Sequence, residues 1–168
     1  MGNTVSNLQI AVVGRANVGK SLLIDCIFNQ RKINPKELIE KGKESRAKTE
    51  RILPNGKIAL FKTVIIDEKP DTDLDKSALS ESDFYILVLE AREELFNIET
   101  ELISYFQKNQ IPFLVAVNKI EFGTNPHLLA ELDALEVIYF ELSCKENAGI
   151  ENFRKTLIHL LPGEKKIN

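Results

Sequence analysis

One short segment constrains the fold of this chain more than any other. The run Gly14-Arg15-Ala16-Asn17-Val18-Gly19-Lys20-Ser21 consists of a glycine, four further residues, and then Gly-Lys-Ser. It follows an apolar, β-branched run at residues 8–13, and apolar residues recur at helical spacing from residue 20 to about residue 29. A glycine-containing loop between a buried strand and a helix turns main-chain N–H groups toward one point, where the helix N-terminus adds partial positive charge. The segment therefore predicts a phosphate-binding loop.

Two side chains of this loop have the chemistry that a nucleotide phosphate site needs. Lys20 can reach the β- and γ-phosphates and supply catalytic positive charge, and the Ser21 hydroxyl can bind Mg²⁺. The alternative is a glycine turn followed by a surface lysine, and the flanking strand and helix argue against it. The residues that we predict to bind nucleotide here are Gly14, Asn17, Val18, Gly19, Lys20, Ser21 and Leu22.

Further along the chain, the hydrophobic pattern alternates between strands and helices. Buried strands are predicted at residues 84–89, 113–117 and 137–142, and helices at residues 98–108, 128–135 and about 150–161. Pro54-Asn55-Gly56 is a hairpin signal that predicts flanking strands at residues 48–53 and 57–66. Together with the first strand, these elements predict a three-layer α/β fold whose six-stranded sheet is mainly parallel, with one antiparallel edge strand.

The bulk properties indicate one globular domain. A chain of 168 residues suits a single domain over residues 1–168, with 162–168 as a linker or tail, and residues 31–47 are a long polar connection. The net charge of −3 gives no field that would attract nucleic acid. The apolar run at residues 8–13 is too short to cross a membrane, and no export signal precedes it. We therefore expect a cytoplasmic protein in which Cys26 and Cys144 are reduced.

A second motif predicts which base the nucleotide carries. Asn118-Lys119-Ile120-Glu121 directly follows the strand predicted at residues 113–117. A carboxylate at Glu121 can accept the N1–H and the exocyclic N2–H of guanine, a pair of donors that adenine lacks. Glutamate has one more methylene than the commoner aspartate, so its reach is displaced. Ser143-Cys144-Lys145, after the strand at residues 137–142, would enclose the base from the other side through backbone N–H groups.

Asp67 is a candidate metal ligand and catalytic residue. It ends the strand predicted at residues 57–66, where a carboxylate can hold Mg²⁺ through a water molecule while the following loop senses the γ-phosphate. The alternative is an ordinary aspartate at the end of a strand.

The chain resembles the P-loop GTPases of the translation-factor-related class, specifically the bacterial Era-like and MnmE-like group. The resemblance lies in four segments that follow one another along the chain: the phosphate loop, Asp67, Asn118-Lys119-Ile120-Glu121 and Ser143-Cys144-Lys145. Within that group, Gln110-Ile111-Pro112-Phe113 and Leu160-Leu161-Pro162-Gly163-Glu164 are similar to the GTPase domain of the HydF family of [FeFe]-hydrogenase maturation factors. The resemblance implies Mg²⁺-dependent binding of GTP and GDP, GTP hydrolysis, and regulation of a protein partner or of further domains; a homodimer is compatible with it. Asn17 implies a role for K⁺.

The chain departs from this family at two places. The family has a glycine N–H that contacts the γ-phosphate where this chain has Pro70, and proline has no N–H. The family also caps Mg²⁺ with a threonine, for which the chain offers Thr49 or Ser45. We therefore expect slow hydrolysis, with a non-hydrolysing interaction module as the alternative. A P-loop kinase is a third reading, which Asn118-Lys119-Ile120-Glu121 disfavours.

Overall fold

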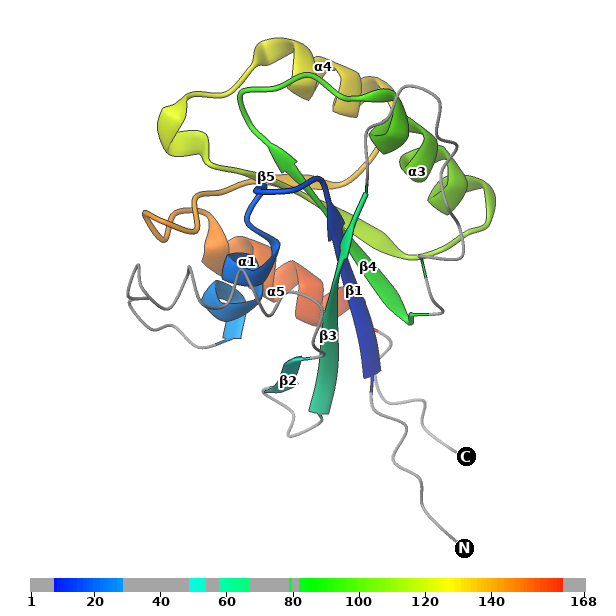
Figure 1. Cartoon of the computed structure of the whole chain (residues 1–168), viewed down its shortest axis with the longest axis vertical. Helices are drawn as coiled ribbons and strands as arrows, with labels where there is room; N and C mark the ends of the chain where they lie inside the picture. The colour runs from blue at the N-terminus through cyan, green and yellow to red at the C-terminus, as the bar shows by residue number, and fades with distance from the viewer. Residues whose placement is uncertain (1–7, 29–48, 54–57, 67–78, 80–81, 162–168) are drawn as a thin grey trace, which may run out of the picture.

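A six-stranded sheet forms the centre of the protein. The computed structural model describes residues 8–28, 49–53, 58–66, 79 and 82–161, and its strand order is β2-β3-β1-β4-β5-β6 (Figure 1). Five strands run parallel: β1 (Leu8–Gly14), β3 (Ile58–Ile65), β4 (Phe84–Glu90), β5 (Phe113–Asn118) and β6 (Tyr139–Glu141). The short strand β2 (Thr49–Ile52) pairs antiparallel with β3. The parallel strands confirm the predicted α/β class.

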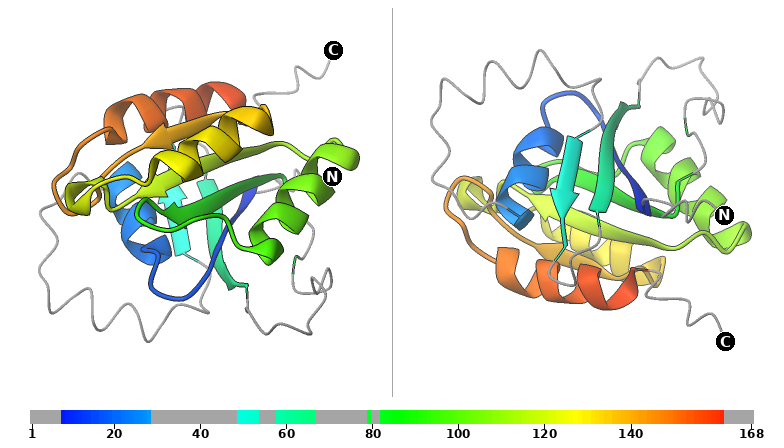
Figure 2. Two further views of the ribbon diagram at one scale, coloured as in Figure 1. Left: turned by 90° about the horizontal axis from the view of Figure 1, so that it is seen from above. Right: turned by 90° about the horizontal axis from the view of Figure 1, so that it is seen from below.

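Helices cover both faces of the sheet. Helices α1 (Lys20–Phe28) and α5 (Ile150–Leu160) pack on one face, and α3 (Asn97–Lys108) and α4 (Pro126–Ala134) pack on the other (Figures 1 and 2). A single 3₁₀ turn, η2 (Ile120–Phe122), follows β5. The described residues therefore form the three layers that the alternating pattern predicts.

The strand β4 shows why the centre of the sheet is so apolar. It has the sequence FYILVLE, and all of its residues except the last are buried. Phe84, Ile86 and Val88 face α1 and α5, whereas Tyr85, Leu87 and Leu89 face α3 and α4. A parallel strand covered on both faces must be apolar at every position, in contrast to the alternation of a half-exposed strand.

The register of the parallel strands brings several loops to one edge of the sheet. Gly14, at the end of β1, lies opposite Val88 of β4, and Glu90, at the end of β4, lies opposite Asn118 of β5. The chain therefore leaves β1, β4 and β5 at the same edge. In open parallel sheets, ligands bind beyond the carboxyl ends of the strands.

Most predicted elements differ from the structure by about one residue at an end, and two of them begin two residues away from their predicted starts. The strand predicted at residues 137–142 is only Tyr139–Glu141, because Glu136 has a φ of 57° and the N–H of Val137 bonds back to the carbonyl of Leu132 in the turn after α4. Helix α4 begins at Pro126, two residues before the predicted start, because the Asn125 side chain accepts the N–H of His127.

Some predictions concern residues outside the described ranges. They are the connection at 31–47, the turn Pro54-Asn55-Gly56, the candidate ligands Ser45 and Asp67, the substitution Pro70 and the tail at 162–168. These stay predictions. Within the described ranges, no helix is long and apolar enough to cross a membrane.

Candidate nucleotide-binding site

The phosphate loop connects β1 to α1 and needs glycine at both ends. A Cβ on Gly14 would lie 2.7 Å from the carbonyl oxygen of Val88, so a side chain there would collide with the neighbouring strand. Gly19 has a φ of 100°, and its carbonyl accepts the N–H of Leu23 at 2.9 Å to begin α1. A Cβ on Gly19 would lie 2.5 Å from Nδ2 of Asn118. The two glycines therefore let the loop pass close to β4 and to the residue that ends β5.

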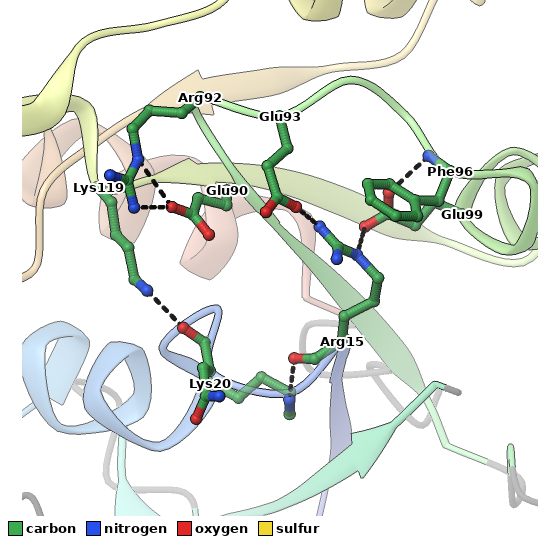
Figure 3. Close-up of polar contacts among 9 residues, drawn as sticks. Arg15, Lys20, Glu90, Arg92, Glu93, Phe96, Glu99 and Lys119 are labelled. Carbon is green, nitrogen blue, oxygen red and sulfur yellow. Dashed lines mark hydrogen bonds and ion pairs between the residues drawn. The ribbon is translucent and has the colours of Figure 1, made fainter. Parts of the chain in front are cut away.

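Lys20 lies beneath this loop. Its Nζ donates hydrogen bonds to the carbonyl oxygens of Gly14 at 3.0 Å and of Arg15 at 2.7 Å, and Figure 3 shows the bond to Arg15. An ammonium group has three N–H donors, so these two bonds leave one for a ligand oxygen. Burial, and then the positive charge of Arg15, lower the pKa of Lys20 to about 8. An anion bound at the loop would attract the charged ammonium and so raise this pKa again.

Asn118 connects three segments that are far apart in the sequence. This buried residue donates from Nδ2 to the carbonyl of Val18 at 2.9 Å, and its Oδ1 accepts the N–H of Cys144 at 3.2 Å. The next residue, Lys119, extends toward the phosphate loop (Figure 3). Its Nζ donates to the carbonyl of Asn17. Because one side chain is bonded to both, the phosphate loop and the loop after β6 keep a fixed separation.

Glu121 presents an unused acceptor in the same region. Its Oε1 is buried and has no hydrogen-bond partner in the described part of the chain. A buried acceptor without a partner is costly, and native structures contain few of them. A ligand N–H would satisfy this oxygen, as the predicted contact with the edge of guanine requires.

The loop after β6 has a closed conformation. Ser143 and Ala148 exchange two backbone hydrogen bonds, at 2.9 and 3.0 Å, and Ser143 Oγ accepts the N–H of Glu146 at 2.9 Å. Inside this loop, Lys145 Nζ lies 5.8 Å from the ring centroid of Phe122. The backbone of Ser143, Cys144 and Lys145 is therefore held beside η2, the turn that contains Glu121.

The two cysteines are free thiols that lie together. Cys26 of α1 donates from its thiol to the carbonyl of Cys144 at 3.5 Å, and both side chains are buried. The hydrogen bond with the Cys26 thiol, together with burial, holds the pKa of Cys144 well above its usual value. Cys144 is therefore a neutral thiol. Its backbone N–H is already donated to Asn118 Oδ1 and that of Ser143 to the carbonyl of Ala148, so of the three N–H groups predicted to enclose the base only that of Lys145 has no such internal bond in the described part of the chain.

The predicted metal ligands are only partly described. Ser21 is the second residue of α1 and is half-buried, and the neighbouring Leu22 packs against the apolar core on that face. Thr49 begins β2, and Asp67 is outside the described ranges. The described residues contain no cluster of three metal-binding side chains. The position of Ser21 suits the hydroxyl ligand, and the rest of the Mg²⁺ set stays a prediction.

Sequence reasoning missed one group of contacts in this region. The Arg15 side chain points away from the phosphate loop (Figure 3). It contacts Glu93 and Phe96 of the connection between β4 and α3, and Glu99 in the first turn of α3. The sequence contains a signal for only one of the contacts of Glu99. A glutamate at the third position of a helix can accept the backbone N–H of the residue before the helix, which here is Phe96. The pairing with Arg15 itself has no local signal.

The fold and the loop after β1 define a class of protein: an α/β nucleotide-binding domain of the phosphate-loop type. The chain matches a known protein family over more than half of its length. Residues 9–119 match the family described as 50S ribosome-binding GTPases. The chain belongs to this family of GTPases.

Similar proteins agree with that assignment. The chain is similar to GTPase Der of Buchnera aphidicola, with 32% identity over 127 residues that make up 68% of this chain and 27% of the relative. It is similar to the tRNA modification GTPase MnmE of Enterococcus faecalis, with 26% identity over 93% of this chain and 34% of the relative. The chain thus spans about a third of these relatives.

The FeoB G-domain from Methanococcus jannaschii shares the fold. Its TM-score is 0.61 at 18% identity, and the match covers 91% of this chain and 96% of that one.

Proposed function

We propose that this domain binds GTP and GDP together with Mg²⁺ and hydrolyses GTP slowly, and that its nucleotide state regulates a protein partner or further domains. One observation carries the proposal: Asn118 bonds to the phosphate loop through Val18 and to the loop after β6 through Cys144. Phosphate recognition and base recognition therefore belong to one connected site. The family supports the GTPase activity.

Each part of the proposed site has a distinct task. The main-chain N–H groups of the phosphate loop and the Lys20 ammonium would neutralise the phosphates, and Glu121 would select guanine by accepting from N1–H and N2–H. Ser21 would provide a hydroxyl ligand for Mg²⁺, with Asp67 and either Thr49 or Ser45 as further candidates. When bound, Mg²⁺ would supply charge neutralisation for the phosphates. No general base is required, because positioning and charge neutralisation provide most of the rate enhancement in phosphoryl transfer.

Binding of the base is tested by calorimetry. GDP, ADP and inosine diphosphate, which lacks the N2 amine, are titrated into the protein with Mg²⁺. We expect GDP to bind more tightly than inosine diphosphate and much more tightly than ADP. Equal affinities for GDP and ADP would disprove guanine selectivity and would favour the P-loop kinase.

Hydrolysis needs a separate test, because Pro70 favours a second function, that of a non-hydrolysing module that acts through protein contact. GTP is incubated with excess protein and Mg²⁺ in a single-turnover assay, in K⁺ and in Na⁺. We expect slow phosphate release that is faster in K⁺. Release at the rate of GTP without protein, despite measurable binding, would establish the second function.

A narrower proposal concerns hydrogenase maturation. It is supported by Gln110-Ile111-Pro112-Phe113 and Leu160-Leu161-Pro162-Gly163-Glu164, which are similar to the HydF family. We expect the coding sequence after residue 168 to continue into a dimerisation domain and an iron–sulfur cluster domain. Continuation into any other domain would remove this proposal and leave the GTPase proposal intact.

A further inference from the structure

Arg15 lies in the phosphate loop, but its side chain does not point to the place where phosphates would bind. Its guanidinium group forms ion pairs with Glu93 and Glu99, and its Cζ lies 3.8 Å from the ring centroid of Phe96 (Figure 3). Only 14% of the Arg15 side chain is exposed. We call Arg15, Glu93, Phe96 and Glu99 the loop latch. It connects the end of β1 to the beginning of α3. Arg15 and Glu99 are 84 positions apart in the sequence.

Glu99 is the most constrained member of the latch. Its side chain is 1% exposed, so its charge must be compensated inside the protein. One carboxylate oxygen, Oε1, accepts the N–H of Phe96 at 2.9 Å, and the other, Oε2, accepts Nε–H of Arg15 at 3.3 Å. The same side chain therefore holds the first turn of α3 and the phosphate loop.

The latch also acts on Lys20. The backbone carbonyl of Arg15 accepts a hydrogen bond from Lys20 Nζ at 2.7 Å. The side chain of the same arginine is held by the other members of the latch. Fixing Arg15 therefore fixes one of the two carbonyl groups that hold the ammonium. A binding loop that is already ordered loses less conformational entropy when its ligand arrives.

From these contacts we propose that Glu99 is a positioning residue for the phosphate loop. By holding Arg15, Glu99 keeps the loop and Lys20 in the arrangement that a nucleoside diphosphate requires. The proposal rests on the nucleotide-binding function proposed above. It also gives Arg15 a structural task, since two carboxylates already neutralise its charge. Arg15 is therefore not a charge donor to the γ-phosphate.

The test compares GDP binding by the intact protein with binding by three variants. Glu99→Gln keeps an oxygen that can accept the Phe96 N–H but loses the charge that pairs with Arg15, and Arg15→Gln removes the other partner. Arg154→Gln is the matched control, because the Arg154 side chain is 16% exposed, close to the 14% of Arg15. It pairs with Glu151 on α5 and bonds to the carbonyl of Ile27 near the C-terminal end of α1, the end away from the phosphate loop. Dissociation rates are measured by displacement of a fluorescent GDP analogue.

We expect Glu99→Gln and Arg15→Gln each to release GDP roughly tenfold faster, as the loss of one charged hydrogen bond implies. The double variant should be no worse than the more affected single variant, because both changes break the same contact. Arg154→Gln should stay within about twofold of the unchanged protein, because its contacts with Glu151 and with the carbonyl of Ile27 do not involve the phosphate loop. Additive effects, or unchanged release in both latch variants, would overturn the latch while leaving GDP binding established. Failure of the unchanged protein to bind GDP would overturn both proposals.

Hydrogen exchange without nucleotide separates loop positioning from general destabilisation. In Arg15→Gln, the amides of the phosphate loop should exchange faster, whereas the amides of β4 and β5 should not. Arg15→Lys should restore part of this protection, because it keeps the charge but not the planar group that stacks on Phe96. If Glu99→Gln does not fold, these two variants decide the question by themselves. Uniformly faster exchange across the sheet would show that the latch contributes only to global stability.

Discussion

Substitution of Gly19 by alanine tests the connection between the phosphate loop and Asn118, the residue that ends β5. The new methyl group would lie 2.5 Å from Nδ2 of Asn118, well inside contact distance, and the φ of Gly19 is 100°. Asn118 cannot move away cheaply, because its amide is bonded to Val18 at 2.9 Å and to the N–H of Cys144 at 3.2 Å. The collision should therefore disturb both halves of the site.

The structure provides a control that separates this collision from backbone strain. Gly123 has nearly the same φ, 101°, but a Cβ there would meet nothing within 4 Å. An alanine at such a φ costs on the order of 1–3 kcal/mol in either position. Only Gly19→Ala should also lose the Asn118 to Val18 hydrogen bond, worth about 1 kcal/mol. Its Tm should therefore fall by roughly 2–4 °C more than that of Gly123→Ala.

The two variants should differ more clearly in binding than in stability. Calorimetry should show at least about a fivefold loss of GDP affinity in Gly19→Ala, as expected from about 1 kcal/mol of lost interaction. Gly123→Ala should bind GDP within about threefold of the unchanged protein, because its strain is not transmitted to Asn118. Equal losses of Tm and of GDP affinity in the two variants would refute the idea that Asn118 is held against the phosphate loop at Gly19.

Three further predictions follow from single residues. The pKa of Lys20 is about 8 in the free protein, and bound phosphates should raise it. GDP binding then takes up a proton, and the affinity of the protein for GDP should fall about tenfold from pH 7 to pH 9. An affinity that does not change with pH, measured by calorimetry in EDTA, would contradict this prediction. Glu121→Gln should reduce the preference for GDP over inosine diphosphate, because an amide oxygen accepts the N1–H and N2–H pair less well than a carboxylate; an unchanged ratio would exclude Glu121 from base selection. Asn125→Ala removes the cap that accepts the His127 N–H at 2.9 Å, and it should lower the stability by about 1 kcal/mol without changing GDP release; thermal unfolding and the displacement assay check both parts.

The sequence by itself determined the parts of the protein that depend on neighbouring residues. Residues 14–21 are predicted as a phosphate loop because a strand, a glycine turn and a helix follow one another within a short stretch. The buried strand β4 is predicted because every position must be apolar when both faces are covered. The likeness of the described fold to the FeoB G-domain, at a TM-score of 0.61, agrees with these local patterns.

The tertiary structure decided the contacts between residues that are distant in the chain. Asn118 is 100 positions from Val18, and Glu99 is 84 positions from Arg15, so no local pattern reports either hydrogen bond. Both pairs meet because the parallel strands β1, β4 and β5 all end at one edge of the sheet. Periodicity and turn preferences are properties of neighbouring residues, whereas the convergence of distant loops requires strand order and register, which only the folded sheet specifies.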